Sequence, residues 1–180
     1  MRSVRLTVVV LAAALLRAAL EPIGDGFSTG VFAVTLVAIA WLGRDAAVGE
    51  ARWGRGVSIA AGLLLGLVLL APLAASSLNG RPLSGFWQWG AIAAGVATLE
   101  ELVIRGRLQQ RWTGEVGPLA AILAGAAVFA LIHLPRYGLS AMPLDFSVGL
   151  AFGGLRAISG RVMPGAIAHV MADWGAWFSA

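Results

Sequence analysis

Ionisable side chains are scarce in this sequence, and several of them interrupt long apolar stretches. Charged residues make up 12% of the 180 residues. A charged group at the centre of a bilayer costs roughly 2.5–3.5 kcal/mol even on the most lenient scale. Ionisable residues inside apolar runs are therefore candidates for a functional site, and both histidines of the chain are among them. The set comprises Glu100, Glu101, Arg105, His133, Asp145, His169 and Asp173.

These residue types permit three kinds of chemistry. Carboxylates and imidazoles that meet inside a membrane can activate a water molecule for hydrolysis. They can bind a metal ion such as zinc, or they can relay protons and ions as in a transporter. The chain has no cysteine, which excludes a thiol nucleophile and a thiolate zinc site. It also has no HExxH zinc motif.

The two adjacent glutamates are expected to have different roles. On a helix, Glu100 and Glu101 project about 100° apart. Glu101 and Arg105 are four residues apart, so they can form an ion pair that neutralises both charges. Glu100 then shares its face with Ala93 and Ala97, whose small side chains leave room for a cavity.

The histidines show the same helical spacing. Phe129 and His133 are four residues apart, so the aromatic ring can wall a cavity and hold the imidazole. His169 and Asp173 are also four residues apart and share one face of their helix. A glutamate that meets these groups has the surroundings of a general base.

Three short motifs contain these residues in order. Residues 100–105 read EExxxR, residues 129–133 read FxxxH, and residues 169–173 read HxxxD. In this order and separation, each inside an apolar run, they resemble the signature of the CPBP family. This family comprises the CAAX-protease and bacteriocin-processing intramembrane endopeptidases, whose mechanism is of the glutamic type. The resemblance covers residues 86–178.

The resemblance implies hydrolysis of a peptide bond in or at the edge of the membrane. Carried over to this sequence, Glu100 is the general base that activates water, helped by His133. His169 and Asp173 then bind the oxyanion or orient the water. The supporting, structural residues are Glu101, Arg105 and Phe129.

Position 173 departs from the prenyl endopeptidases of the family, which have asparagine there. An amide can donate a hydrogen bond to an oxyanion, whereas an ionised carboxylate cannot. Asp173 must therefore be protonated, or else it orients His169 as a carboxylate does for a catalytic imidazole. We expect no metal or other cofactor. A divalent metal stays an alternative, and its ligands would be Glu100, His133, His169 and Asp173.

The composition predicts helices in a membrane. The chain is 59% apolar and its mean hydropathy is +0.85. A soluble domain of this size would expose large apolar patches. We expect one all-α transmembrane domain over residues 1–180, with accessory helices in 1–85 and a protease core in 86–178 formed by the last four helices. The seven predicted spans are 4–21, 27–42, 57–75, 86–104, 118–134, 143–158 and 162–178.

The fourth and sixth predicted spans have features that bear on how the helices pack. Glu100 and His133 can meet only if the fourth helix continues past Arg105, so 86–112 is the better prediction and Arg105 is then intramembrane. The sixth span contains Gly149, Gly153 and Gly154, whose small size permits close helix packing.

Arginine placement predicts the topology, because positively charged loops stay in the cytoplasm. Arg17 is left out of this comparison of loops, because it lies inside the first apolar run. It is expected to reach an interface or to pair with an acid. One group of loops contains Arg2, Arg5, Arg44, Arg52, Arg55, Arg105, Arg107, Arg111, Arg156 and Arg161, whereas the alternate loops contain Arg81 and Arg136. The N-terminus is therefore expected in the cytoplasm, and the location is a bacterial inner membrane.

The expected partners are the lipid bilayer and a membrane-anchored protein or peptide substrate. The basic residues are dispersed, so no nucleic acid is expected, and the oligomeric state stays open. One branch of the family, the myxosortases, removes C-terminal sorting anchors, and the compact, lysine-free chain suits such a role. Two other functions stay open, namely a proton- or ion-coupled transporter and a non-catalytic immunity or binding protein of the same fold.

Overall fold

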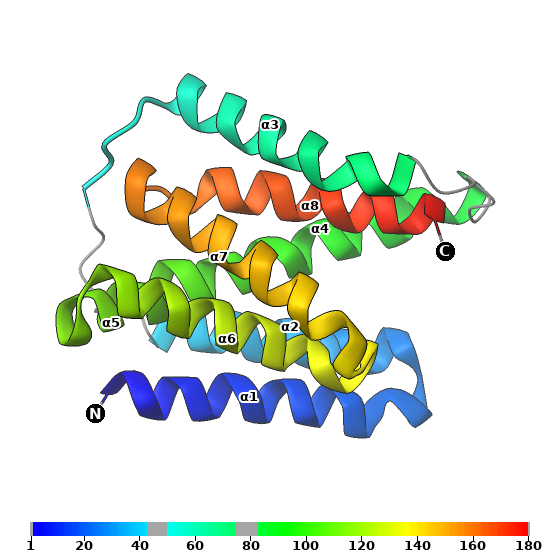
Figure 1. Ribbon diagram of the computed structural model, residues 1–180. Helices are drawn as coiled ribbons and strands as arrows, with labels where there is room; N and C mark the ends of the chain where they lie inside the picture. Colours follow the sequence, from blue (N-terminus) through cyan, green and yellow to red (C-terminus); the bar gives the residue numbers. More distant parts are fainter. Residues whose placement is uncertain (1, 43–49, 75–82, 180) are drawn as a thin grey trace.

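The computed structural model describes residues 2–42, 50–74 and 83–179, and in these segments the chain is helical and has no strand. The helices form one bundle (Figure 1). Their bounds are α1 (Arg2–Leu20), α2 (Asp25–Leu42), α3 (Arg55–Ala74), α4 (Phe86–Val103), α5 (Gln109–Val116), α6 (Pro118–Tyr137), α7 (Met142–Ser159) and α8 (Met163–Ser179). Short 3-10 turns occupy Glu21–Ile23, Leu83–Gly85 and Leu139–Ala141.

This architecture confirms the predicted all-α bundle, since each of the seven expected spans corresponds to a helix. Most ends differ by one to three residues, as is usual for helix boundaries. The last residue of the expected span 57–75 lies outside the described residues.

The end of the fourth span at 104 was wrong, and even the extension to 112 was too short. α4 passes without a break into a π-helical turn, Ile104–Leu108, and then into α5. The helical path stops only at Gly117, whose φ of 88° suits glycine, followed by Pro118. Arg105 is consequently inside the bundle and fully buried.

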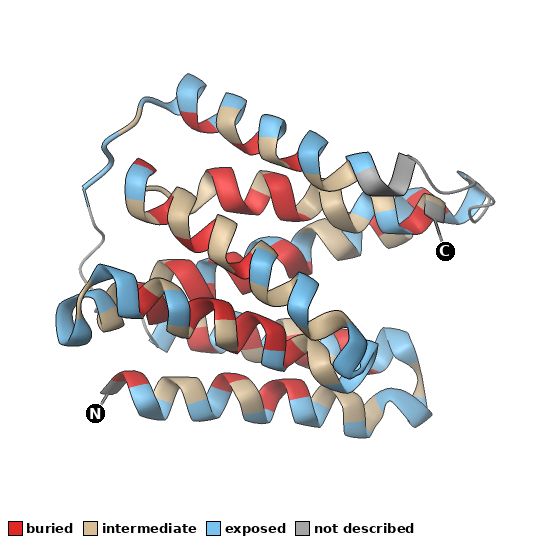
Figure 2. Cartoon of the chain, in the orientation of Figure 1, coloured by how far each residue is buried: buried red, intermediate tan, exposed pale blue. Residues whose placement is uncertain are grey.

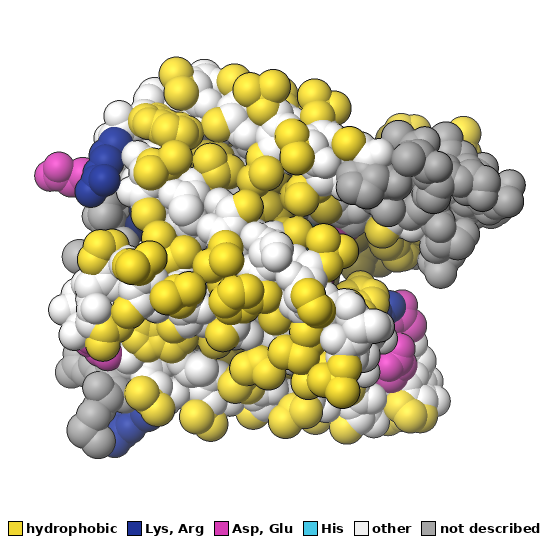
Figure 3. All heavy atoms as spheres, viewed as in Figure 1, with side chains coloured by type: hydrophobic (Ala, Val, Ile, Leu, Met, Phe, Trp, Pro, Cys, Tyr) yellow, Lys and Arg dark blue, Asp and Glu magenta, His cyan; other side chains and the backbone are white. Residues whose placement is uncertain are grey.

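The outside of the bundle is apolar, as expected for a protein in lipid. Within the described residues, three stretches are long and apolar enough to cross a membrane, Ser3–Ile23, Asp25–Leu42 and Pro118–Tyr137, and Arg55–Ala71 is a shorter apolar helix. Apolar side chains cover the face seen in Figure 3, and charged side chains gather toward the ends of the helices. Buried residues face the centre of the bundle (Figure 2).

Close packing of α6 and α7 depends on small residues. A Cβ on Gly149 would lie 2.8 Å from the Cα of Ala126, and a Cβ on Gly153 would lie 3.1 Å from the side chain of Ile122. The predicted role of these two glycines is confirmed. Gly154 was wrongly included, because a Cβ there would meet no atom within 4 Å.

The arginine-rich segments lie at one end of the bundle. Arg107 donates a hydrogen bond to the Ala40 carbonyl, Arg52 to that of Ala157, and Arg161 to that of Trp53. Arg105 and Arg156 are buried inside the bundle, so counting them among loop arginines was wrong. Arg44, Arg81 and the side chain of Arg2 lie outside the described residues.

Candidate active site

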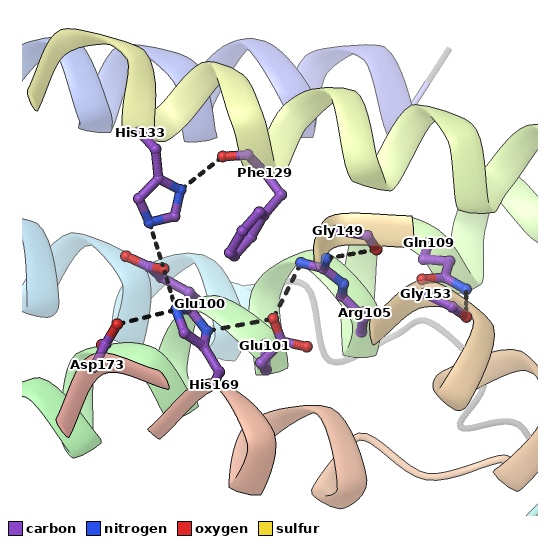
Figure 4. Close-up of polar contacts among 10 residues, drawn as sticks. All are labelled: Glu100, Glu101, Arg105, Gln109, Phe129, His133, Gly149, Gly153, His169 and Asp173. Atoms are coloured by element: carbon purple, nitrogen blue, oxygen red, sulfur yellow. Dashed lines mark hydrogen bonds and ion pairs between the residues drawn. The ribbon is translucent and has the colours of Figure 1, made fainter. Parts of the chain in front are cut away.

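Three helices carry the ionisable residues of the site to the centre of the bundle (Figure 4). α4 provides Glu100 and Glu101, α6 provides His133, and α8 provides His169 and Asp173. α8 packs against α4, and α6 packs against α7 on the neighbouring side. Residues from three separate motifs of the sequence thus meet in one cluster.

Glu100 lies in the middle of this cluster. Its Oε2 atom is 3.8 Å from Nε2 of His133 and 3.8 Å from Nε2 of His169. The side chain is almost completely buried, with 4% of the residue exposed. A separation of 3.8 Å is too long for a direct hydrogen bond. It suits polar groups that share one small partner such as a water molecule.

The imidazole of His133 has a fixed orientation. Its Nδ1 is 2.8 Å from the carbonyl oxygen of Phe129. Because a carbonyl can only accept, Nδ1 carries the proton, and in the neutral ring Nε2 presents its lone pair to Glu100. The Phe129 ring packs against the imidazole with centroids 4.5 Å apart, as the spacing predicted. Tyr137 also stacks on His133, with ring centroids 5.7 Å apart and 16° between the planes.

His169 is surrounded by three carboxylates. Its Nε2 is 3.8 Å from Oδ1 of Asp173 as well as from Glu100. Its Nδ1 is 3.6 Å from Oε1 of Glu101. Asp173 and Glu100 therefore face the same ring nitrogen, whereas Glu101 faces the other one. The side chain of Asp173 is 37% exposed, in contrast to the fully buried Glu101.

Glu101 and Arg105 form the ion pair that their spacing predicts, with Nη1 3.1 Å from Oε1 and both side chains buried. Arg105 also donates to the Gly149 carbonyl at 3.0 Å. Its guanidinium lies over the rings of Phe129 and Phe152, at 4.8 and 5.6 Å from their centroids. One arginine therefore connects α4 with both α6 and α7.

A cavity of about 450 Å³ opens on the exposed side of this cluster. Its lining includes Glu100, His133, His169 and Asp173, but neither Glu101 nor Arg105. α1, α2, α4, α6 and α8 all contribute to the wall. Helices of residues 1–85 therefore take part in the cavity, and their description as accessory stays a prediction.

Comparison with protein-family models matches residues 82–175 to the family described as type II CAAX prenyl endopeptidase Rce1-like. The match spans just over half of the 180-residue chain and contains all three motifs. The chain belongs to this family. It is an enzyme, a CAAX-type intramembrane endopeptidase, and its apolar helices place it in the membrane. No match is found among curated proteins or solved structures.

Family membership agrees with the resemblance seen in the three motifs. The places of three cavity or bundle residues of this CAAX-type endopeptidase were not predicted from the sequence. Tyr137 continues the four-residue spacing of Phe129 and His133, which was a usable signal. Gln109 donates to the Gly153 carbonyl at 2.9 Å and holds the π-helical segment against α7. Nothing in the sequence indicated this contact. Arg17 was noticed, but not as a residue that lines the cavity.

Other polar and aromatic residues lie outside the cluster formed by Glu100, His133, His169 and Asp173. Asp145 is half-buried in the first turn of α7 and is not among the residues that line the cavity. Trp174 donates to the Gly90 carbonyl at 2.9 Å, and Trp177 packs on Trp89 with centroids 4.8 Å apart. These tryptophans join α8 to the start of α4.

The residues of this endopeptidase also fit a metal ion. Ligand atoms of Glu100, His133 and His169 all lie within 4.8 Å of one another. One carboxylate and two imidazoles, with a position left for water, form a donor set that zinc accepts in hydrolytic enzymes. Asp173, expected as a fourth ligand, is not part of this group.

Proposed function

We propose that this endopeptidase hydrolyses a peptide bond of a membrane-anchored protein or peptide inside the cavity, with Glu100 as the general base. The observation that carries the proposal is the position of the Glu100 carboxylate. It lies in a cavity wall, 3.8 Å from the Nε2 atoms of both histidines. A water molecule bound between these three groups is within reach of a base that can remove its proton.

The reaction consumes one water molecule. Glu100 accepts a proton from this water while the oxygen attacks the carbonyl carbon of the scissile bond. His133, with Nδ1–H fixed on the Phe129 carbonyl, uses its Nε2 lone pair to orient the water. The tetrahedral intermediate then collapses as the C–N bond breaks, and the proton held by Glu100 passes to the leaving nitrogen. The products are a new carboxylic acid, which keeps the second proton of the water, and a new amine.

His169 and Asp173 are proposed to stabilise the oxyanion or to orient the water. His169 can donate to the oxyanion when Nε2 carries a proton. Asp173 can donate only in its protonated form. When ionised, it instead accepts a hydrogen bond from His169 or from water. We assign supporting roles to Glu101, Arg105 and Phe129, which hold the histidines and the helices in place.

The mechanism is proposed without a metal, as a glutamic-type protease. The alternative is zinc held by Glu100, His133 and His169, which would lower the pKa of a bound water molecule. Elemental analysis of the purified protein, together with activity after prolonged chelation, separates the two. We expect activity to survive chelation. Loss of activity that zinc alone restores would establish the metal mechanism.

The finer substrate proposal is removal of a C-terminal sorting anchor in a bacterial inner membrane, with the N-terminus in the cytoplasm. The lysine-free composition and the arginine-rich end of the bundle support this orientation and host type. Reporter fusions at the two termini test the orientation. A strain that lacks the gene should accumulate anchor-bearing proteins, and unchanged anchors would contradict this role.

The deciding experiment compares protein termini in host membranes. One strain carries the wild type and the other Glu100→Gln, at matched expression. New C-termini found only with the wild type would establish the activity and identify substrates. Identical termini in both strains, with both proteins folded, would overturn the proposed role of Glu100. The same experiment distinguishes a protease from a transporter or a non-catalytic immunity protein.

A further inference from the structure

Arg17 lies on α1, outside the residues 82–175 that match the family model, yet it lines the same cavity as Glu100 and both histidines. One sequence expectation was that it pairs with an acid. Within the described segments, its polar contact is instead a hydrogen bond from Nη2 to Thr29 Oγ1, 3.3 Å long. A cationic group therefore stands in the cavity beside the proposed reaction site.

The surroundings of Arg17 orient its half-buried guanidinium but leave part of its hydrogen-bonding capacity unused. The group lies over the ring of Phe32, 5.0 Å from the centroid, and the aromatic face fixes its plane. Its Nε atom is buried and has no hydrogen-bond partner among the described residues. Glu100 and Asp173 of the same cavity attract this cation at longer range, but among the described residues neither is hydrogen-bonded to it. A polar group without a hydrogen-bond partner is costly to bury, so an acceptor on the molecule that enters the cavity would stabilise the guanidinium.

A carboxylate is the group that fits. The planar guanidinium binds a carboxylate through two parallel N–H···O bonds, which a neutral amide cannot match. The cavity volume of about 450 Å³ is in the range of small-ligand pockets, so it holds a short piece of extended peptide and not a helix. An extended chain advances roughly 3.3–3.6 Å per residue. A carboxylate at Arg17 is therefore only a few residues from a bond at Glu100.

We propose that Arg17 binds a carboxylate of the substrate within a few residues of the scissile bond, and that it selects substrates by this contact. The inference rests on the proposed function of Glu100, because it takes the reaction site to be in the same cavity. The carboxylate belongs either to the C-terminus of the substrate or to an acidic side chain. The chemistry at Arg17 is the same for both, and peptides can separate them.

The test uses the full chain in detergent micelles and pools of hydrophobic peptides. The pools differ in two features only: each peptide ends in a free carboxylate or an amide, and it contains one internal aspartate or none. Products are identified by mass spectrometry. We expect the wild type to cleave carboxylate-bearing peptides with a kcat/KM roughly 10- to 100-fold higher. Arg17→Gln should lose this preference through KM. Arg5→Gln, an exposed position on the same helix, is the matched control and should keep it.

The outcomes identify the source of the carboxylate. A preference for the free acid over the amide assigns Arg17 to the C-terminus, and a preference for internal aspartate with either ending assigns it to a side chain. Should Arg17→Gln keep the wild-type preference while Glu100→Gln abolishes cleavage, the Arg17 proposal is overturned and the proposed function stands. Arg17→Lys retains the charge without the planar fork, and it should lose part of the preference.

A binding measurement makes the result independent of cleavage. The probes are acetyl-trileucine and its C-terminal amide, added to the Glu100→Gln protein during thermal unfolding. We expect the acid to raise Tm more than the amide does, and this difference to vanish when Arg17→Gln is added. Equal shifts from both probes would overturn the proposal. A third outcome separates the two proposals. If the acid-specific rise in Tm requires Arg17 but cleavage does not depend on Glu100, the anion site at Arg17 stands and the proposed function is rejected.

Discussion

Glu100 and Glu101 are neighbours in the sequence but belong to two different regions of the molecule. Glu100 faces the cavity together with His133, His169 and Asp173. Glu101 does not line the cavity but faces a fully buried part of the bundle, called the closed side below. There Nη1 of Arg105 lies 3.1 Å from Oε1 of Glu101 and neutralises its charge. On the cavity side the polar groups stand 3.8 Å apart, so they can bind a small molecule between them. On the closed side they are paired with each other and with the backbone.

The difference shows how one residue type acquires two functions at positions about 100° apart on a helix. A carboxylate that is already paired with a guanidinium stabilises the bundle but has little freedom to exchange a proton with substrate. A carboxylate next to imidazoles and open space can accept and release a proton during turnover. His169 touches both regions, because Nε2 faces Glu100 and Nδ1 faces Glu101.

The largest effect is expected on the cavity side. Glu100→Gln removes the base but keeps the shape, so kcat/KM should fall by roughly 10²- to 10⁴-fold, the usual contribution of a general base. The unfolding temperature should change little, because no ion pair of the closed side is touched. Turnover of a cleaved peptide and thermal unfolding are measured on the same preparation. Wild-type turnover in this variant would remove Glu100 from the mechanism.

The closed side should show the opposite behaviour, with stability affected first. Arg105→Met leaves Glu101 buried without its partner, and breaking a buried pair in this way costs about 3–5 kcal/mol. Replacing both residues, Glu101→Met with Arg105→Met, should recover much of this loss in free energy of unfolding. Arg5→Met, at an exposed position of α1, is the control. A double variant as unstable as the single one would mean that Arg105 acts mainly through Gly149 and the aromatic rings.

Activity of the same double variant sharpens the comparison. A double variant that regains stability but not turnover would assign Glu101 a second role at Nδ1 of His169, 3.6 Å away. Recovery of both properties would confine Glu101 to the closed side.

The division between the two glutamates could be predicted from the sequence, because it follows from helix geometry and from the four-residue spacing of Glu101 and Arg105. The convergence of Glu100 with His133 also required a longer fourth helix. The end of this helix at Val116 was not predicted. The π-helical turn at Ile104–Leu108 depends on tertiary contacts, and the helix continues through Gly106 and Gly114.

Contacts between helices could not be predicted, because one sequence gives no information on which faces meet. Gln109 and Gly153 are one such pair. Arg17 is another case, since its place in the cavity depends on how α1 packs against α2 and α6. Tyr137 carried a spacing signal, but stacking on His133 also required the helix to continue past Pro135.

A smaller effect is expected where a glycine borders the closed side. A Cβ at position 165 would lie 2.8 Å from Oε2 of Glu101, so Gly165→Ala must displace that carboxylate. We expect a loss of about 1–3 kcal/mol in free energy of unfolding, as for other overpacked sites, and a lower kcat. Gly154→Ala, with open space at its Cβ, is the matched control and should be neutral. Equal behaviour of the two variants would mean that α8 can shift freely against Glu101.

The smallest effect is expected at Tyr137, at the end of α6. Its ring lies 5.7 Å from that of His133 at an angle of 16°, so it limits rotation of the imidazole. Aromatic contacts of this kind contribute about 0.5–1.5 kcal/mol. Tyr137→Leu should therefore lower kcat/KM by roughly 2- to 10-fold, the equivalent of that energy. Tyr137→Phe keeps the ring and should retain wild-type turnover. If Tyr137→Phe is as impaired as Tyr137→Leu, the hydroxyl rather than the ring face contributes, and Tyr137 joins the polar groups on the cavity side.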